Sequence, residues 1–247
     1  MNKTLCIDWG NSLVKAAIFE ADKIIHHEQL DPNAALSTLV GLIEIHQPQG
    51  AILSSVVSNM ADVQMHVREK VAHFLKLDMN TFLPIMNAYS SPETLGVDRL
   101  AIAVGAQAAF SDKNVLAISL GTCITYNFVQ KNKAFRGGAI SPGLHMRLKS
   151  MHEWTDRLPE VKPDGEVLLL GYDTETCMRS GAVFGMASEI DGMVTAFADQ
   201  YPDFNAVLTG GDSAMFVNKL KSKIFADPDL LMKGLNLILL HNVPQLR

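Results

Sequence analysis

Residues 5–12 of the chain read Leu5-Cys6-Ile7-Asp8-Trp9-Gly10-Asn11-Ser12, and residues 117–126 read Ala117-Ile118-Ser119-Leu120-Gly121-Thr122-Cys123-Ile124-Thr125-Tyr126. In each stretch an apolar segment reaches a glycine and a small polar residue, and a second apolar segment follows. A glycine at such a corner lets the backbone approach a ligand closely, because no Cβ is in the way. The neighbouring N–H groups, amides and hydroxyls can donate to phosphate oxygens. The two corners therefore predict two similar halves that hold a polyphosphate between them.

Three consecutive strands are expected at the start of each half, over 3–8, 12–19 and 22–28 and over 114–118, 122–129 and 134–140. Helices are expected over 33–47, 60–75, 98–110, 143–153, 174–200, 213–221 and 229–241, and further strands over 50–55, 80–85 and 205–209. Strands that alternate with helices predict an α/β fold with sheets covered by helices. We place the boundary near residue 112, with an N-terminal half over 1–111 and a C-terminal half over 112–247.

Composition excludes several classes of protein. A net charge of −5 leaves no basic surface of the kind that binds nucleic acid. The three cysteines are widely spaced and odd in number, which favours a reduced setting over a disulfide framework. The N-terminus does not resemble a signal peptide, and no apolar run reaches membrane-spanning length. We therefore expect a cytoplasmic protein that binds neither nucleic acid nor membranes.

A loop that enters a helix lies between the halves, over residues 89–100. It places Asp98 at the helix N-terminus with Arg99 beside it. An aspartate there is commonly only a helix cap, and an arginine on the first turn is commonly solvated. Gly96 just before the pair, and Tyr89 upstream, favour a binding site instead.

Three further motifs follow the second corner: Gly137-Gly138-Ala139-Ile140-Ser141-Pro142-Gly143, Asp173-Thr174-Glu175-Thr176-Cys177-Met178-Arg179-Ser180-Gly181 and Thr209-Gly210-Gly211-Asp212. With the two corners and the run Gly96-Val97-Asp98-Arg99, they resemble, in content and order, the type III pantothenate kinases. That family belongs to the superfamily of sugar kinases, hsp70 chaperones and actin. The resemblance covers residues 5 to 212. It implies two similar actin-like (ribonuclease H-like) halves, each a mixed sheet flanked by helices, with a cleft between them.

The resemblance implies that ATP phosphorylates the primary hydroxyl of pantothenate, which is the first step of coenzyme A biosynthesis. Asp98 is the expected general base, since a carboxylate in hydrogen-bond reach of an alcohol can orient it and accept its proton. Asp8 is expected near Mg²⁺ and the phosphates. The implied substrate-binding residues are Tyr89, Gly96, Val97, Asp98, Arg99 and Thr174. The implied ATP-binding residues are Asp8, Trp9, Gly10, Asn11, Ser12, Leu13, Val14, Lys15 and Thr122.

Some of these assignments stay open. Lys15 lies on a strand whose alternate residues face solvent, so surface placement competes equally with ligand contact. Ser119 stands where the family usually has an aspartate that helps to hold a monovalent cation, commonly potassium. A potassium or ammonium site at Ser119 is therefore expected to be weaker, built mainly from carbonyls, or absent. Asp173 stands where asparagine is usual, which is a mild change at a helix cap.

Similar proteins are homodimers in which the long helix over 174–200 packs at the interface, so the resemblance also implies a homodimer. Two other functions remain open at this point. One is a catalytically impaired, nucleotide-binding regulatory relative on the same fold, which only the loss of an acid at Ser119 favours. The other is a kinase of the same superfamily that acts on a sugar or acetate, which Tyr89 and the Asp98-Arg99 pair disfavour.

Overall fold

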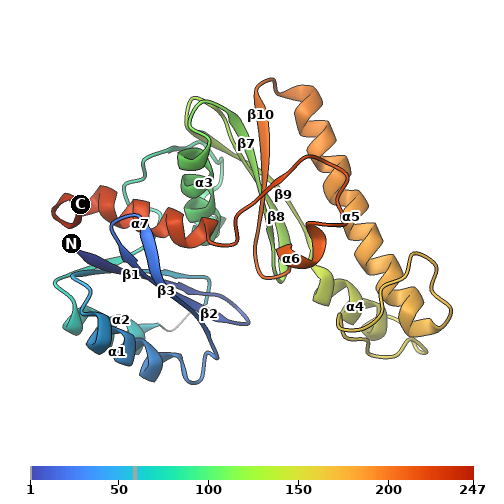
Figure 1. Ribbon diagram of the computed structural model, residues 1–247, viewed down its shortest axis with the longest axis horizontal. Coiled ribbons are helices and arrows are strands. Elements are labelled where there is room, and N and C mark those ends of the chain that lie inside the picture. The colour runs from blue at the N-terminus through green and yellow to red at the C-terminus, as the bar shows by residue number, and fades with distance from the viewer. Residues whose placement is uncertain (1, 58–59) are drawn as a thin grey trace. The chain divides into compact units, whose positions relative to one another are not determined.

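The computed structural model describes residues 2–57 and 60–247 and divides into two compact units (Figure 1). The first unit comprises the chain up to Ser111 together with Val129–Arg136 and Asp229–Arg247, and the second comprises Asp112–Phe128 and Gly137–Pro228. The predicted halves, 1–111 and 112–247, differ from these units in two segments, because residues 129–136 and 229–247 group with the first unit. The physical reasons are that helix α7 (Leu230–Asn242) packs along helix α3 (Val97–Ala109), and that Ala134 and Phe135 pair with Met86 and Asn87 of the first unit.

The first unit is built on a five-stranded mixed sheet in the order β3-β2-β1-β4-β5. Its strands are β1 (Lys3–Trp9), β2 (Val14–Glu20), β3 (Lys23–Leu30), β4 (Gly50–Ser55) and β5 (His73–Lys76). The first three are antiparallel neighbours, while β4 runs parallel to β1 and β5 parallel to β4. Successive strand residues point to opposite faces. Leu5 and Ile7 accordingly cluster with residues of α1 (Ala35–His46) and α2 (Ala61–Lys70), whereas Cys6 clusters with α3 and α7.

The second unit repeats this arrangement. Its strands follow the order β9-β8-β7-β10-β11, with β10 parallel to both β7 and β11. They are β7 (Asn114–Leu120), β8 (Cys123–Val129), β9 (Ala134–Pro142), β10 (Phe204–Thr209) and β11 (Phe225–Ala226). Its helices are α4 (Leu144–Glu153), α5 (Thr174–Gln200) and α6 (Ser213–Phe216). The shared strand order confirms the prediction of two similar halves, each with a mixed sheet flanked by helices.

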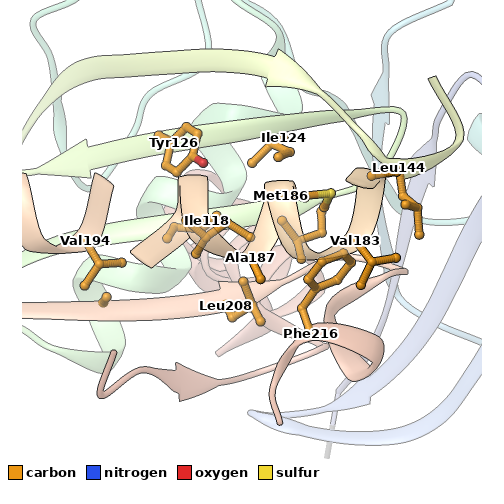
Figure 2. Packing of buried hydrophobic residues seen from close by; sticks show 14 of the residues in the cluster. Ile118, Ile124, Tyr126, Leu144, Val183, Met186, Ala187, Val194, Leu208 and Phe216 are labelled. Carbon is orange, nitrogen blue, oxygen red and sulfur yellow. The ribbon is translucent and has the colours of Figure 1, made fainter. Parts of the chain in front are cut away.

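Helix α5 supplies most of the helical side of the second unit's core. Figure 2 shows Val183, Met186 and Ala187 of α5 gathered with side chains of the strands and of α6. Met186 and Val183 are fully buried, as are Ile118 of β7 and Leu208 of β10. Burial of such side chains is worth about 1.5–3 kcal/mol each, which holds this long helix on its sheet.

The predicted elements are confirmed except in three places. The helix expected over 60–75 ends at Lys70, because residues 73–76 pair with β4 as β5. The strand expected over 80–85 is a loop, in which Asp78 accepts hydrogen bonds from Asn80 and Thr81. The helix expected over 213–221 is the short α6. Among the described residues, the helices are too short or too polar to span a membrane.

Two short 3-10 helices, η1 (Pro92–Thr94) and η2 (Pro244–Leu246), and strand β6 (Met86–Asn87) complete the described elements. Strand β6 pairs in parallel with the first residues of β9, Ala134 and Phe135. The start of β9, up to Arg136, groups with the first unit, so this pairing lies within that unit and fixes the start of the loop that leads to α3.

Candidate active site

The first glycine corner closes β1 onto β2. The backbone N–H of Gly10 donates to the carbonyl of Leu13 at 3.1 Å, so four residues make the turn between Trp9 and Val14. A Cβ on Gly10 would lie 3.0 Å from the Leu13 oxygen, which explains the glycine. Asn11 and Ser12 are exposed on this turn, whereas the Val14 side chain is fully buried. Val14 can therefore offer a ligand only its backbone.

Asp8 lies at the end of β1 beside this turn and is buried. It faces Lys15 on β2 and Ser54 on β4, and the Ser54 hydroxyl donates to Asp8 Oδ1 at 3.1 Å. Burial, and then the negative charge of Asp98, raise the pKa of Asp8 to about 6, while Lys15 and the hydrogen bond from Ser54 oppose this rise. The structure thus brings Asp8, Lys15 and Asp98 together in the first unit. Lys15 is half-buried beside Asp8, which favours a site over a solvated surface.

Asp98 lies in the first turn of α3, two residues after the N-cap residue Gly96. Its carboxylate folds back over Gly96, where a Cβ would lie 2.5 Å from Asp98 Oδ1. The Arg99 N–H donates to the carbonyl of Gly96 at 3.1 Å, and among the described residues α3 has no side-chain cap. Burial raises the pKa of Asp98, and the nearby backbone N–H groups and the Arg99 charge oppose this rise. A raised pKa makes a carboxylate a better proton acceptor, so Asp98 has the chemistry of a general base, while Gly96 occupies the N-cap position.

Arg99 is buried, contrary to the solvated placement that is common on a first helical turn. Its Cζ lies 5.9 Å from the ring centroid of Tyr89 and 5.9 Å from that of Phe135, and Tyr89 is also a hydrogen-bond partner. Burial lowers the pKa of Arg99 and Tyr89 opposes this change. Guanidinium groups are attracted to aromatic faces at this range. Phe135 has no site signal in the sequence, because only its pairing with β6 brings it to Tyr89.

The second corner brings together three motifs in the second unit. The N–H of Gly121 donates to Cys123 at 3.1 Å, and the N–H of Gly143 donates to the carbonyl of Thr122 at 3.1 Å. Gly210 has φ +97° and passes so close to Leu120 that a Cβ would lie 2.8 Å from its carbonyl carbon. The N–H of Asp212 donates to that same Leu120 carbonyl at 3.2 Å. The end of β7 is therefore surrounded by close-packed backbone, with Thr122 exposed beside it.

Ser119 and Thr174 are the remaining predicted site residues. Ser119 lies on β7 opposite Thr209 of β10 and is partly exposed. Thr174 is the exposed first residue of α5, directly after Asp173. Asp173 is the N-cap and accepts the N–H of Thr176 at 2.8 Å, as expected of a cap residue. In the described part of the chain, no three His, Cys, Asp or Glu side chains form a metal-binding group.

The predicted site residues are thus divided between the units. Tyr89, Gly96, Val97, Asp98 and Arg99 lie in the first unit with residues 8–15. Ser119, Thr122 and Thr174 lie in the second unit. Asp8 of β1 interacts electrostatically with Lys15 of β2 and with Asp98 of α3, and Asp98 interacts in turn with Arg99.

Comparison with known proteins adds a family match. The family model described as type III pantothenate kinase matches residues 4–196. The chain is 42% identical to the type III pantothenate kinase of Bacteroides fragilis (strain YCH46) over 238 residues, which cover 96% of this chain and 98% of that relative. It is 36% identical to the protein of the same name from Christiangramia forsetii, over 98% of this chain and 99% of that one.

Solved structures share the fold at low sequence identity. A ROK family glucokinase from Streptomyces griseus, solved with glucose and AMPPNP, superposes with a TM-score of 0.57 at 12% identity, over 96% of this chain and 98% of its own. Component A of the (R)-2-hydroxyglutaryl-CoA dehydratase of Acidaminococcus fermentans gives 0.56 at 11% identity, over 100% and 99% of the two chains. These likenesses establish the actin-like fold.

Proposed function

The chain belongs to the type III pantothenate kinase family, and from this premise we propose a role for each of its site residues. The family's reaction is phosphorylation of pantothenate by ATP with Mg²⁺, which yields 4′-phosphopantothenate for coenzyme A biosynthesis. This chain is accordingly an ATP-dependent pantothenate kinase. The match over residues 4–196 supports an active kinase and gives no support to a non-catalytic regulatory relative.

We propose that Asp98 is the general base. Its carboxylate accepts the proton of the pantothenate primary hydroxyl as that oxygen bonds to the γ-phosphorus, while the bond from phosphorus to the bridging oxygen breaks and its electron pair leaves with ADP. The observation that carries this role is the partly buried carboxylate at the start of α3, whose pKa is raised by burial. Phosphoryl transfer depends mainly on positioning and charge. Arg99, held against Tyr89, supplies positive charge and orientation on the substrate side.

The two glycine corners are proposed to bind ATP. In the first, Trp9–Lys15 offers backbone N–H groups, the exposed side chains of Asn11 and Ser12, and the Lys15 cation. In the second, the exposed Thr122 offers its hydroxyl, and Gly121 leaves room for close approach because it has no Cβ. Mg²⁺ is typically held by one or two carboxylates together with substrate phosphates, which fits Asp8, a buried carboxylate whose charge is destabilised. When bound, Mg²⁺ supplies positive charge for the phosphate oxygens.

A monovalent cation is proposed to contribute little to this enzyme. Ser119 offers a neutral hydroxyl, and its strand neighbour Thr209 is neutral as well. ADP release should therefore proceed at similar rates with potassium, ammonium or sodium as the sole monovalent cation. S119D should introduce a preference for potassium. A strong potassium requirement in the unmodified protein would contradict this proposal.

We further propose that the enzyme is a cytoplasmic homodimer. Four large apolar side chains that precede Thr174 in the sequence are exposed. They are Trp154, Leu169, Leu170 and Tyr172, with exposed fractions of 85%, 79%, 86% and 72%. Exposed apolar groups of this size are typical of interaction surfaces. A second copy that covers them would lie beside Thr174. Sedimentation should show a dimer that L170D weakens, and a monomer at working concentration would refute the proposal.

The test of the general base is D98N in a coupled assay of pantothenate-dependent ADP release. We expect turnover to fall by about a hundredfold or more, the usual contribution of a positioned base. ATP affinity, measured without pantothenate, should be unchanged. E93Q is the matched control, because Glu93 is an exposed carboxylate of the same loop. If D98N keeps most of its turnover, the assignment is wrong.

A further inference from the structure

A network of polar side chains in the second unit lies outside the residues assigned above. Glu189, on α5, accepts a hydrogen bond from the hydroxyl of Tyr126 at 3.0 Å and forms an ion pair with Arg147 of α4. The side chains of Arg147 and Glu189 are only 22% and 29% exposed. Tyr126 itself is buried in the core, where Figure 2 shows its ring near Ile124 and the α5 ribbon.

The Arg147 guanidinium extends this network to the end of β9. Its Nε donates to the carbonyl of Pro142 at 2.8 Å, and its Nη2 donates to the Ser141 hydroxyl at 3.0 Å as well as to Glu189. A guanidinium is a rigid fork of donors, so fixing one edge of it on Glu189 fixes the direction of the others. Arg147 thereby links Ser141 and Pro142 to Glu189 of α5, a helix that is distant in sequence.

The next residue connects this anchor to the second glycine corner. Gly143 donates its N–H to the Thr122 carbonyl at 3.1 Å. A Cβ on Gly143 would lie 2.7 Å from that carbonyl oxygen and closer still to the Gly121 carbonyl. Two backbones in such contact cannot shift independently, because densely packed regions transmit displacements. Any movement of Pro142 and Gly143 therefore displaces Gly121 and Thr122.

We propose that Glu189 is a positioning residue for the nucleotide, acting through Arg147 and the 141–143 turn on the corner that carries Thr122. The inference rests on the proposed role of that corner in ATP binding. Hydrogen bonds between ionised partners are the strongest in this network. Loss of the Glu189–Arg147 pair should therefore shift the 141–143 turn more than loss of any other contact in the network. Glu189 touches no substrate in this scheme.

The experiment compares E189Q with D191N. Asp191 is a carboxylate two residues further along the same helix, and it accepts the N–H groups of Lys221 and Ser222 at 3.0 and 2.8 Å. Both changes remove a carboxylate that anchors a loop by hydrogen bonds, but only Glu189 is connected, through Arg147, to the 141–143 turn. ATP binding is measured by calorimetry with Mg²⁺ and no pantothenate, and KM values are measured for both substrates.

We expect E189Q to weaken ATP binding about tenfold, the factor that corresponds to one charge-assisted hydrogen bond, and to raise KM for ATP but not for pantothenate. D191N should leave ATP affinity unchanged. R147K keeps the cation but loses the fork, so it should weaken ATP binding similarly and, combined with E189Q, add little more.

Unchanged ATP affinity in folded E189Q or R147K would overturn the inference, and so would an equal loss in D191N, which would show general loosening of α5. If E189Q does not fold, R147K decides the question by the same measurement. Failure of the proposed function has a different signature. In that case the unmodified protein would release no ADP in response to pantothenate, whatever the variants do to ATP binding.

Discussion

Replacing Gly234 by alanine tests the close packing of α7 against α3. Alanine favours the helix, but its Cβ collides with the neighbouring backbone, so the two effects on stability oppose each other. At Gly234 of α7, a Cβ would lie 2.7 Å from the carbonyl carbon of Ala101 and 3.1 Å from the backbone nitrogen of Gly105, both on α3. Non-bonded atoms need about 3.5 Å, and the Ala101 carbonyl oxygen lies closer still to this Cβ, so G234A requires the helices to separate by more than about 1 Å. The atoms approached are backbone and cannot rotate away.

The change in unfolding free energy of G234A is the sum of a helix-propensity gain and an overpacking cost. Alanine gains about 1 kcal/mol over glycine in a helix interior. Overpacking costs about 1–3 kcal/mol, and a rigid backbone contact puts G234A at the upper end. We therefore expect a net loss of about 2 kcal/mol. Ala101 lies one turn after Asp98, so α3 would also carry the proposed base out of position, and a misplacement of about 1 Å can cost about a hundredfold in rate.

The assay is urea unfolding followed by circular dichroism, with turnover measured on the same samples. G41A is the matched control, because Gly41 is inside α1 and a Cβ there meets nothing within 4 Å. G41A should gain up to about 1 kcal/mol and keep full turnover. If G234A is as stable as G41A, or destabilised but fully active, the reasoning about the helix crossing is wrong.

Three further predictions concern named side chains. Because folding raises the pKa of Asp8 from 3.8 to about 6, the contribution of Asp8 to the free energy of unfolding is favourable at acid pH and is lost as the pH rises through 6. In unfolding experiments without Mg²⁺, D8N should therefore be more stable than the unmodified protein by up to about 3 kcal/mol at pH 8. Near pH 4 the two proteins should be equally stable. The hydrogen bonds from Thr176 lower the pKa of Asp173, so D173A should lower the melting temperature at pH 7, and the difference should shrink as the pH falls below the ordinary value. F135L should raise KM for pantothenate about three- to tenfold by removing one aromatic face from Arg99, and equal increases for both substrates would contradict this.

The elements that could be predicted from sequence are those whose pattern is local. The hairpin corners at Gly10 and Gly121, the long helix after Asp173 and the alternation of strand and helix all follow from apolar spacing and turn residues. Strand β5 could not be predicted in this way. Residues 73–76 continue an apparently helical spacing, and only their pairing with β4 makes them a strand.

The same distinction applies to the candidate site. The positions of Asp98 and Arg99 at the start of a helix were predictable from the glycine and the loop before them. Their properties were not, because the raised pKa of Asp98 and the aromatic contacts of Arg99 depend on burial and on Phe135. The Glu189–Arg147 pair joins residues 42 positions apart, and neither residue stands in a recognisable motif.

The return of α7 to the first unit has a consequence for synthesis on the ribosome. Domains generally fold as units in the order in which they emerge. Here the N-terminal sheet emerges first, but one of its covering helices, residues 230–242, is translated only after the whole second unit. The nascent chain must therefore carry α3 with its apolar α7-facing side unprotected until residues 230–242 have left the ribosome, a period in which chaperone binding would be most useful.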